Sequence, residues 1–170
     1  AGRRCPRWVH PNAEASYYRF AMPEAEFVRL AAARAQLDVP ARLTLLSNAL
    51  AGVRSGKLKP AVMLKVLAAF DDDTSQKVVE SIASILAMLD SMLVEEEARP
   101  AFRKVVLARL AKHKKRVGWL PKKEEASDDA LLRRDVLWAI GELAEDEATL
   151  REAEEHASRW LTDQTSVDAD

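Results

Sequence analysis

The chain contains only one cysteine and three histidines. Because Cys5 is alone, it cannot form an internal disulfide, and it does not indicate whether the protein works in an oxidising or a reducing compartment. A helical zinc-peptidase motif needs two histidines four residues apart on one helix face, with a glutamate as the base. His10, His113 and His156 do not have that spacing, so we expect no metal site built from this chain alone.

Glycine and proline are also scarce, with five and seven residues, and most of them fall between periodic segments. That distribution favours long helices over many short strands, and without a glycine-rich phosphate loop nothing supports nucleotide binding. No run of about 18 apolar residues exists, so we expect no membrane span and a soluble protein. The sequence does not indicate in which cellular compartment the protein works. The net charge of -1 points to neither nucleic acid nor an anionic membrane as a partner.

Two groups of residues invite a chemical interpretation. Cys5 and His10 could act as nucleophile and base, but a thiolate needs an activating environment, and a structural cysteine beside Pro6 is favoured. A basic run could bind phosphate, but acidic residues in 142–155 offset it, which favours a solvated helix face. The basic run comprises Arg109, Lys112, Lys114, Lys115, Arg116, Lys122 and Lys123.

Helical periodicity dominates the chain after Pro23, where apolar residues recur at helical spacing in six or seven segments. Asp38 is expected to cap the second helix and Gly56 to close it. The third helix is expected to follow Pro60, and Ser127 is expected to cap the sixth helix, which extends through Leu143. The fourth helix has the widest apolar stripe and is expected to be the most buried. Its stripe comprises Val78, Ile82, Ile85, Leu86, Leu89, Met92 and Leu93.

These features predict a mainly α fold of antiparallel helical hairpins in an α-solenoid array of the HEAT or armadillo type. Helix pairs recur roughly every 40 residues, although the letters show no self-similar repeat. Residues 1–22 are rich in aromatics and are expected to form a short β strand or hairpin. An isolated strand pair is marginally stable in water. We therefore interpret residues 1–22 as a β stub from a preceding domain, and residues 23–170 as a truncated helical-repeat domain.

Three motifs, in matching order and spacing, resemble aminopeptidase N or puromycin-sensitive-type zinc metallopeptidases. Residues 8–13 (WVHPNA) and 17–20 (YYRF) resemble the end of that family's β-sandwich, with Ser16 and Tyr17 where a glycine usually precedes the Tyr-Arg pair. Residues 38–49 resemble the helix that opens its C-terminal helical domain, with Asn48 in place of the usual aspartate.

The third motif joins residues 117–119 (VGW) to residues 128–133 (DDALLR) and resembles the family's Gly-Trp, acidic loop and Leu-Arg pattern. Here Gly118 is expected to end the fifth helix. Trp119 is expected to be a buried indole between the fifth and sixth helices.

The resemblance implies a longer parent enzyme that uses zinc to trim amino-terminal residues from peptides. In such enzymes the helical domain forms a bowl over the active site and helps to hold the far end of the peptide. The implied partners are the remaining domains of the parent chain and peptide substrates. The zinc ligands, the base and the exopeptidase loop would lie upstream, so no catalytic residue and no cofactor is assigned to this chain.

Two sets of candidate functional residues follow. An inward-facing Arg133 could clamp a peptide carboxylate bidentately, or it could form a structural ion pair with a nearby acid such as Asp129. The domain interface with the parent is expected to comprise Trp8, Asn12, Tyr17, Tyr18, Arg19 and Phe20. Two further functions stay open: a stand-alone helical-repeat interaction module and, with the least support, an enzyme in its own right.

Overall fold

The computed structural model describes residues 6–165, which contain helices, turns and extended segments but no strand. The chain divides into two compact units, Ala1–Ile82 and Ala83–Asp170, here called the N-terminal and C-terminal units. The boundary falls within helix α4 (Gln76–Leu93). The predicted mainly α fold is confirmed, whereas the α-solenoid array stays a prediction.

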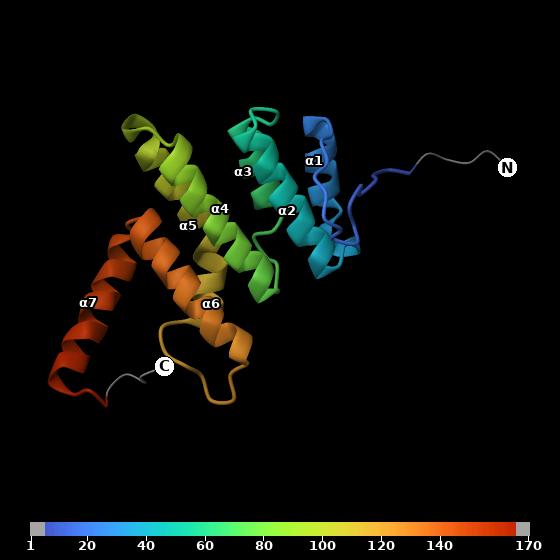
Figure 1. Ribbon diagram of the computed structural model, residues 1–170. Coiled ribbons are helices and arrows are strands. Elements are labelled where there is room, and N and C mark those ends of the chain that lie inside the picture. Colours follow the sequence, from blue (N-terminus) through green and yellow to red (C-terminus); the bar gives the residue numbers. More distant parts are fainter. Residues whose placement is uncertain (1–5, 166–170) are drawn as a thin grey trace. The chain divides into compact units, whose positions relative to one another are not determined.

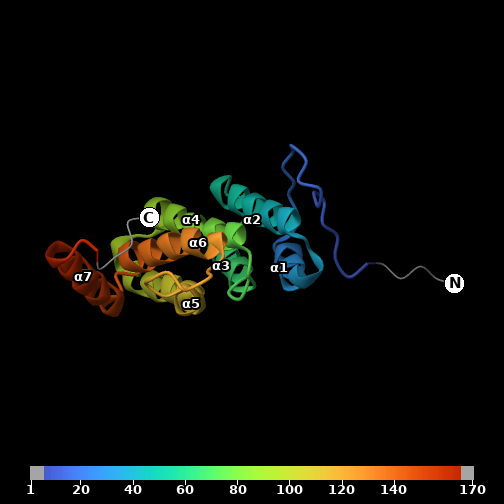
Figure 2. The same ribbon diagram turned by 90° about the horizontal axis from the view of Figure 1, so that it is seen from below.

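The N-terminal unit is built around three helices that pack side by side (Figures 1 and 2). They are α1 (Glu24–Ala32), α2 (Val39–Arg54) and α3 (Pro60–Ala68), with a short 3-10 turn at Arg34–Gln36 between α1 and α2. Their apolar faces meet because apolar side chains recur at helical spacing on each of them. Core residues of this unit include Phe27, Leu30, Leu45, Leu46, Met63, Leu67 and Phe70.

The C-terminal unit contains the rest of α4 and three more helices. A 3-10 turn at Glu96–Ala98 leads into α5 (Arg99–Val117), which packs against α6 (Ser127–Trp138). A π-helical turn, Ala139–Leu143, then leads to α7 (Glu147–Thr162). The side chains buried in this unit include Phe102, Val106, Leu110, Leu132, Val136 and Ile140.

The local helix signals of the sequence are largely confirmed. Asp38 caps α2, since its Oδ1 accepts a hydrogen bond of 2.9 Å from the Ala41 N–H. Gly56 follows α2 with φ of +70°, the left-handed conformation that a residue without Cβ tolerates best. Helix α3, expected to follow Pro60, includes Pro60 as its first residue.

Several predicted boundaries are wrong by small amounts. Ser127 is the first residue of α6 instead of its cap, and Ala126 occupies the N-cap position. The predicted sixth helix gives way at Ala139–Leu143 to a π turn, a local widening that apolar spacing does not reveal. The stripe of α4 is buried as far as Leu89, but Met92 and Leu93 are about half exposed.

The short β strand expected near the N-terminus is absent from residues 6–22. A strand exists only where its backbone pairs with a neighbouring strand. In this segment, backbone groups bond instead to side chains, as the Ser16 and Phe20 N–H groups do to Asn12 and Asn48. Extended aromatic sequence alone therefore did not distinguish a strand from an irregular segment fastened to a helix.

Candidate functional site

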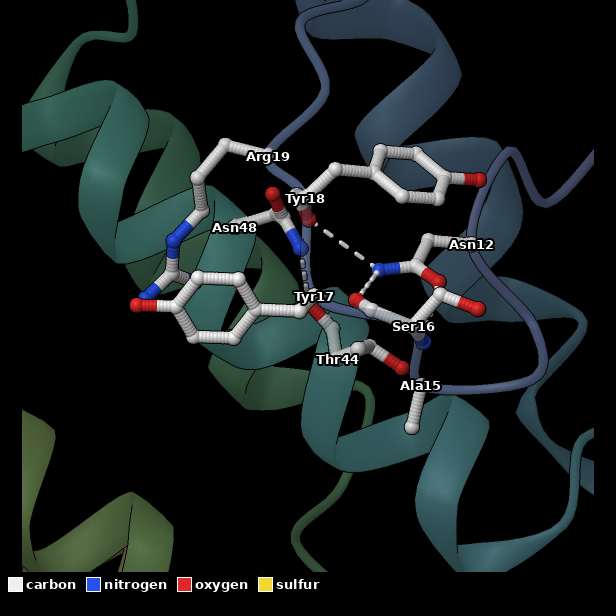
Figure 3. Close-up of a pocket in the computed structure, with 8 residues that line it drawn as sticks. All are labelled: Asn12, Ala15, Ser16, Tyr17, Tyr18, Arg19, Thr44 and Asn48. Carbon is white, nitrogen blue, oxygen red and sulfur yellow. Dashed lines mark hydrogen bonds between the residues drawn. The ribbon is translucent and has the colours of Figure 1, made fainter.

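Asn12 organises the segment that precedes α1 (Figure 3). Its Nδ2 donates to the Ser16 carbonyl at 2.8 Å and to the Tyr18 carbonyl at 3.1 Å. Its Oδ1 accepts from the Ser16 N–H at 2.8 Å, and the side chain is almost wholly buried. Both amide hydrogens and the amide oxygen are thus used, which fixes the loop between residues 12 and 18 in one shape.

His10 connects this loop to helix α2. Its Nδ1 accepts from the Asn12 N–H at 3.1 Å, so the ring proton is assigned to Nε2, which donates to the Ala41 carbonyl at 2.9 Å. Both ring nitrogens are therefore engaged in hydrogen bonds within the fold, and neither is free to accept a proton as a general base would. Cys5, the nucleophile considered beside it, lies outside the described residues.

A second attachment to α2 lies at Phe20. The Phe20 N–H donates to Oδ1 of Asn48 at 3.0 Å, and Nδ2 of the buried Asn48 donates to the Thr44 carbonyl at 2.8 Å. The Phe20 ring stacks on Phe27 of α1 with a centroid distance of 6.0 Å. The segment is thus held to α1 and α2 at two separate places, His10 and Phe20.

The segment before α1 and helix α2 line an open hollow of about 360 Å³. Tyr17 at its rim is fully exposed, Tyr18 is about half exposed, and the two rings point to opposite sides of the segment (Figure 3). Arg19 donates to the Ser47 hydroxyl, and Trp8 is half-buried. Of these residues, Phe20 packs on the helices, whereas Tyr17 is open to solvent. The hollow is lined by Asn12, Ala15, Ser16, Tyr17, Tyr18, Arg19, Thr44 and Asn48.

Arg133 forms a second polar centre, in the C-terminal unit. Its guanidinium donates to the carboxylate of Glu125 and, from Nη2 at 3.1 Å, to the carbonyl of Val117. Val117 is the last residue of α5, so Arg133 satisfies one of the carbonyls that a helix end leaves unpaired. The side chains of Arg133 and Glu125 are each only 9% exposed. This centre ties the loop after α5 to helix α6.

The acid proposed as the structural partner of Arg133 is not the one that pairs with it. Asp129 pairs with Arg116 at 3.1 Å, whereas Glu125 pairs with Arg133. Helical spacing pointed to Asp129, four residues before Arg133. Glu125 lies in the loop before α6, where no regular spacing could single it out.

The Glu125 carboxylate titrates below its usual range. The hydrogen bond from Arg133, followed by one from the Lys122 N–H at 2.7 Å, lowers the pKa of Glu125 from its ordinary value of 4.5. A carboxyl with a lowered pKa in the folded state contributes stability above its unfolded pKa, and this stability is lost as the pH falls through the folded pKa.

We therefore expect Glu125→Gln to flatten the acid limb of the stability curve. The unsubstituted chain should lose stability from about pH 4.5 downward. The Glu125→Gln variant should lose less over the same pH range, because an amide does not titrate. Urea unfolding at a series of pH values measures this difference. Parallel curves for the two proteins below pH 4.5 would contradict it.

Gly118 ends α5 with φ of +66°, as predicted, but Trp119 lies elsewhere than expected. The half-buried indole faces α7 instead of filling the gap between α5 and α6. It packs against the His156 ring in a tilted arrangement at a centroid distance of 5.2 Å, and its Nε1 donates to Glu152. The indole N–H needs an acceptor when it leaves water, and α7 supplies one.

Lys114 of α5 completes this contact with α7. Its Nζ lies 2.8 Å from the Thr149 hydroxyl and 2.9 Å from the Glu152 carboxylate. The hydrogen bonds from Lys114 and then from Trp119 lower the pKa of Glu152. Helix α7 is thus joined to α5 mainly through polar groups.

The described residues do not fit a metal centre. Within residues 6–165, no group of three or more histidine, cysteine, aspartate or glutamate side chains could hold an ion. His113 is buried in α5, and His156 lies against Trp119. In the same range, no helix combines the length and the apolar character that a bilayer span requires.

Residues 8–170 match the family described as "ERAP1-like C-terminal domain". Aminopeptidase M1-A of Oryza sativa subsp. japonica is 30% identical over 153 residues, which cover 86% of this chain but only 17% of that relative. No solved structure matches. The resemblance inferred from the three motifs is confirmed, and the chain belongs to the ERAP1-like C-terminal domain family of aminopeptidase N-type enzymes.

Proposed function

We propose that this chain is the noncatalytic C-terminal helical part of a zinc aminopeptidase that trims amino-terminal residues from peptides. The carrying observation is the family match over residues 8–170, in a chain that spans only 17% of the aminopeptidase to which it is similar. In the proposed parent, this helical part encloses the active site and helps to position the peptide. Zinc would be held by upstream residues.

The proposed interface with the remaining domains is the segment before α1. His10 and Phe20 fasten it to the helices and Asn12 fixes its loop, while Tyr17 is fully exposed and Val9 is 61% exposed. Exposed aromatic side chains on a rigidly held segment are typical of surfaces that bind another protein. We propose that Trp8, Tyr17, Tyr18 and Arg19 meet the preceding domain of the parent, with Asn12 and Phe20 holding them in place.

Arg133 is proposed to bind the carboxylate of a peptide, in competition with the carboxylate of Glu125. Its guanidinium carries the donors that bind a carboxylate bidentately, and Glu125 already supplies such a carboxylate. The terminal carboxylate of a peptide would therefore have to replace Glu125. A purely structural role of the same pair is the alternative.

The purified chain is expected to be inert as a peptidase, with or without added zinc. A catalytic zinc site needs three protein ligands and an open position, and residues 6–165 do not bring such a group together. Release of amino acids from aminoacyl-amide substrates measures this activity, with a full aminopeptidase as positive control. Metal-dependent release that persists through purification to homogeneity would contradict the proposal.

A further inference from the structure

The basic run of the sequence belongs to a segment that carries no acidic side chain. Residues 99–123 contain ten lysines and arginines and no aspartate or glutamate. Helix α5 makes up most of this segment. A run of cations of this length, with no acid among them, creates a positive potential wherever its charges are not paired.

Acids that follow later in the chain do not neutralise the whole of this segment. Within residues 142–155, Glu145 pairs with Arg103, and Glu152 pairs with Lys114 at 2.9 Å. Both of these cations are only partly exposed. The balance of charge expected between the two segments therefore holds for Arg103 and Lys114, but not for the exposed lysines of α5.

The outer face of α5 is a row of alternating lysines and alanines, here called the lysine ridge. Its members are linked by spacings of three and four residues, so they share one face, and each of them is exposed. The ridge comprises Ala101, Lys104, Ala108, Ala111, Lys112 and Lys115. Its first and last lysines lie about 16 Å apart along the helix axis.

The cations of α5 include a paired set and an unpaired set. Arg99 pairs with Asp90 at 3.0 Å, and Arg116 pairs with Asp129 at 3.1 Å. In the described part of the chain, by contrast, none of the three ridge lysines forms an ion pair. These two arginines thus join elements within the C-terminal unit, whereas the ridge lysines present their charge to solvent.

Lys122 adds a further cation at the end of α5. Its Nζ donates to the Arg116 carbonyl in the last turn of the helix. The carboxylate of Glu125, which accepts from the Lys122 N–H, is paired with Arg133. Positive charge therefore continues from the ridge to the C-terminal end of α5.

The side chains of the ridge identify the kind of partner. The ridge contains no aromatic and no large apolar side chain. A helix that binds a membrane surface inserts such side chains below the headgroups, and a single-stranded nucleic acid stacks its bases on aromatic rings. Alanines between the lysines allow another polypeptide to approach closely, and carboxylates on that polypeptide would complement the ammonium groups.

We propose that the lysine ridge binds an acidic polypeptide segment, with its carboxylates opposite Lys104, Lys112 and Lys115. This site is separate from the segment before α1 and from the Arg133 centre, so it goes beyond the proposed function. A single exposed ion pair contributes little. The affinity would therefore come from several carboxylates on one segment, each paired with a different lysine.

Two matched synthetic peptides of about 12 residues, enough to follow the ridge in a helical or an extended form, test this proposal with the whole chain. One alternates pairs of glutamates with pairs of alanines, and the other has glutamine in place of every glutamate. Anisotropy of the labelled peptides measures their binding at low salt and again at about 0.3 M salt, where exposed charges are more strongly screened. The glutamate peptide is expected to bind at least tenfold more tightly at low salt, and to lose most of this advantage at high salt.

A pair of triple variants locates the binding surface. The ridge variant combines Lys104→Gln, Lys112→Gln and Lys115→Gln. The control variant combines Lys59→Gln, Lys65→Gln and Lys77→Gln, at exposed lysines of the N-terminal unit. Both variants lower the net charge by the same amount. The ridge variant should weaken binding of the glutamate peptide by roughly tenfold, and the control variant by about twofold or less.

Equal weakening by the two variants would overturn the proposal, because net charge and not the ridge would then govern binding. Equal binding of the glutamate and glutamine peptides would also overturn it. So would tighter binding of duplex DNA or phosphatidylserine vesicles that the ridge variant abolishes, since the partner would then carry phosphates. Self-association of the chain that the ridge variant abolishes, measured by analytical ultracentrifugation, would identify a second copy as the partner instead.

The substitutions are expected to leave the fold intact. Every replaced lysine is exposed, and glutamine is as good a helix former as lysine. Circular dichroism of both variants verifies that a loss of binding is not a loss of helix.

Discussion

Replacement of Arg133 by methionine is expected to lower the melting temperature of the chain by roughly 5 to 10 °C. Methionine preserves an apolar stem of similar length but cannot donate a hydrogen bond. It would leave Glu125, only 9% exposed, without its cation, and the Val117 carbonyl without a donor at the end of α5. A buried charge or carbonyl that loses its partner costs more than the intact pair contributes.

Arg134→Met is the matched control for this change. Arg134 is the next residue on α6, its side chain is 75% exposed, and it pairs with its neighbour Asp135. Exposed pairs of this kind contribute little, so the melting temperature should change by about 1 °C or less. Thermal unfolding followed by circular dichroism compares the variants. Equal melting temperatures for the two variants would show that the Arg133 centre does not stabilise the unit.

A second measurement in the full-length parent separates the substrate role of Arg133 from its structural role. If Arg133 clamps the peptide, Arg133→Met should raise KM for long peptides relative to dipeptide-sized substrates. Glu125→Gln should lower that ratio, because it removes the competing carboxylate. If the pair is only structural, both substitutions should lower the melting temperature and leave the ratio of KM values unchanged.

Asn12→Ala is expected to release the segment before α1 while the helices stay folded. The substitution removes three hydrogen bonds, two donated to Ser16 and Tyr18 and one accepted from the Ser16 N–H. At about 1 kcal/mol each, their loss should raise the local opening of residues 10–20 by roughly 100-fold. Hydrogen exchange measures this change directly at the Ser16 amide.

Glu14→Ala is the control for this prediction. Glu14 lies in the same loop, but its side chain is exposed and does not support the loop through Asn12. Its exchange profile should match that of the unchanged chain. If the Ser16 amide of Asn12→Ala exchanges as slowly as in the unchanged chain, Asn12 does not organise the loop. If exchange is faster throughout α1 and α2 as well, the effect of the substitution is not limited to residues 10–20.

Local signals in the sequence predicted the helices well because their causes are local. Asp38 caps α2 through a backbone N–H three residues away, and Gly56 adopts a left-handed conformation two residues after α2 ends. Pro60 begins α3 because its fixed φ suits a first helical residue. None of these outcomes depends on residues distant in the chain.

The details of the polar centres could not be predicted in the same way, because they join distant residues through irregular backbone. Trp119 was expected between α5 and α6, but Glu152 of α7, 33 residues later, supplies the acceptor that its indole needs. Glu125 reaches Arg133 from a loop in which Glu124 has φ of +61°. The family resemblance singled out Asn12 as a candidate residue. Its hydrogen bonds to Ser16 could not be predicted from the sequence, because they depend on the folded shape of the loop.

Binding of the chain to the remaining domains of the proposed parent is the most direct test of its role. Those domains, expressed without residues 8–170, should form a saturable complex with the chain in isothermal titration calorimetry. Tyr17→Ala should weaken the complex by roughly tenfold or more, because an exposed aromatic is the proposed anchor of the interface, whereas Glu14→Ala should not. The absence of a complex, or equal weakening by the two substitutions, would contradict a docking role for this segment.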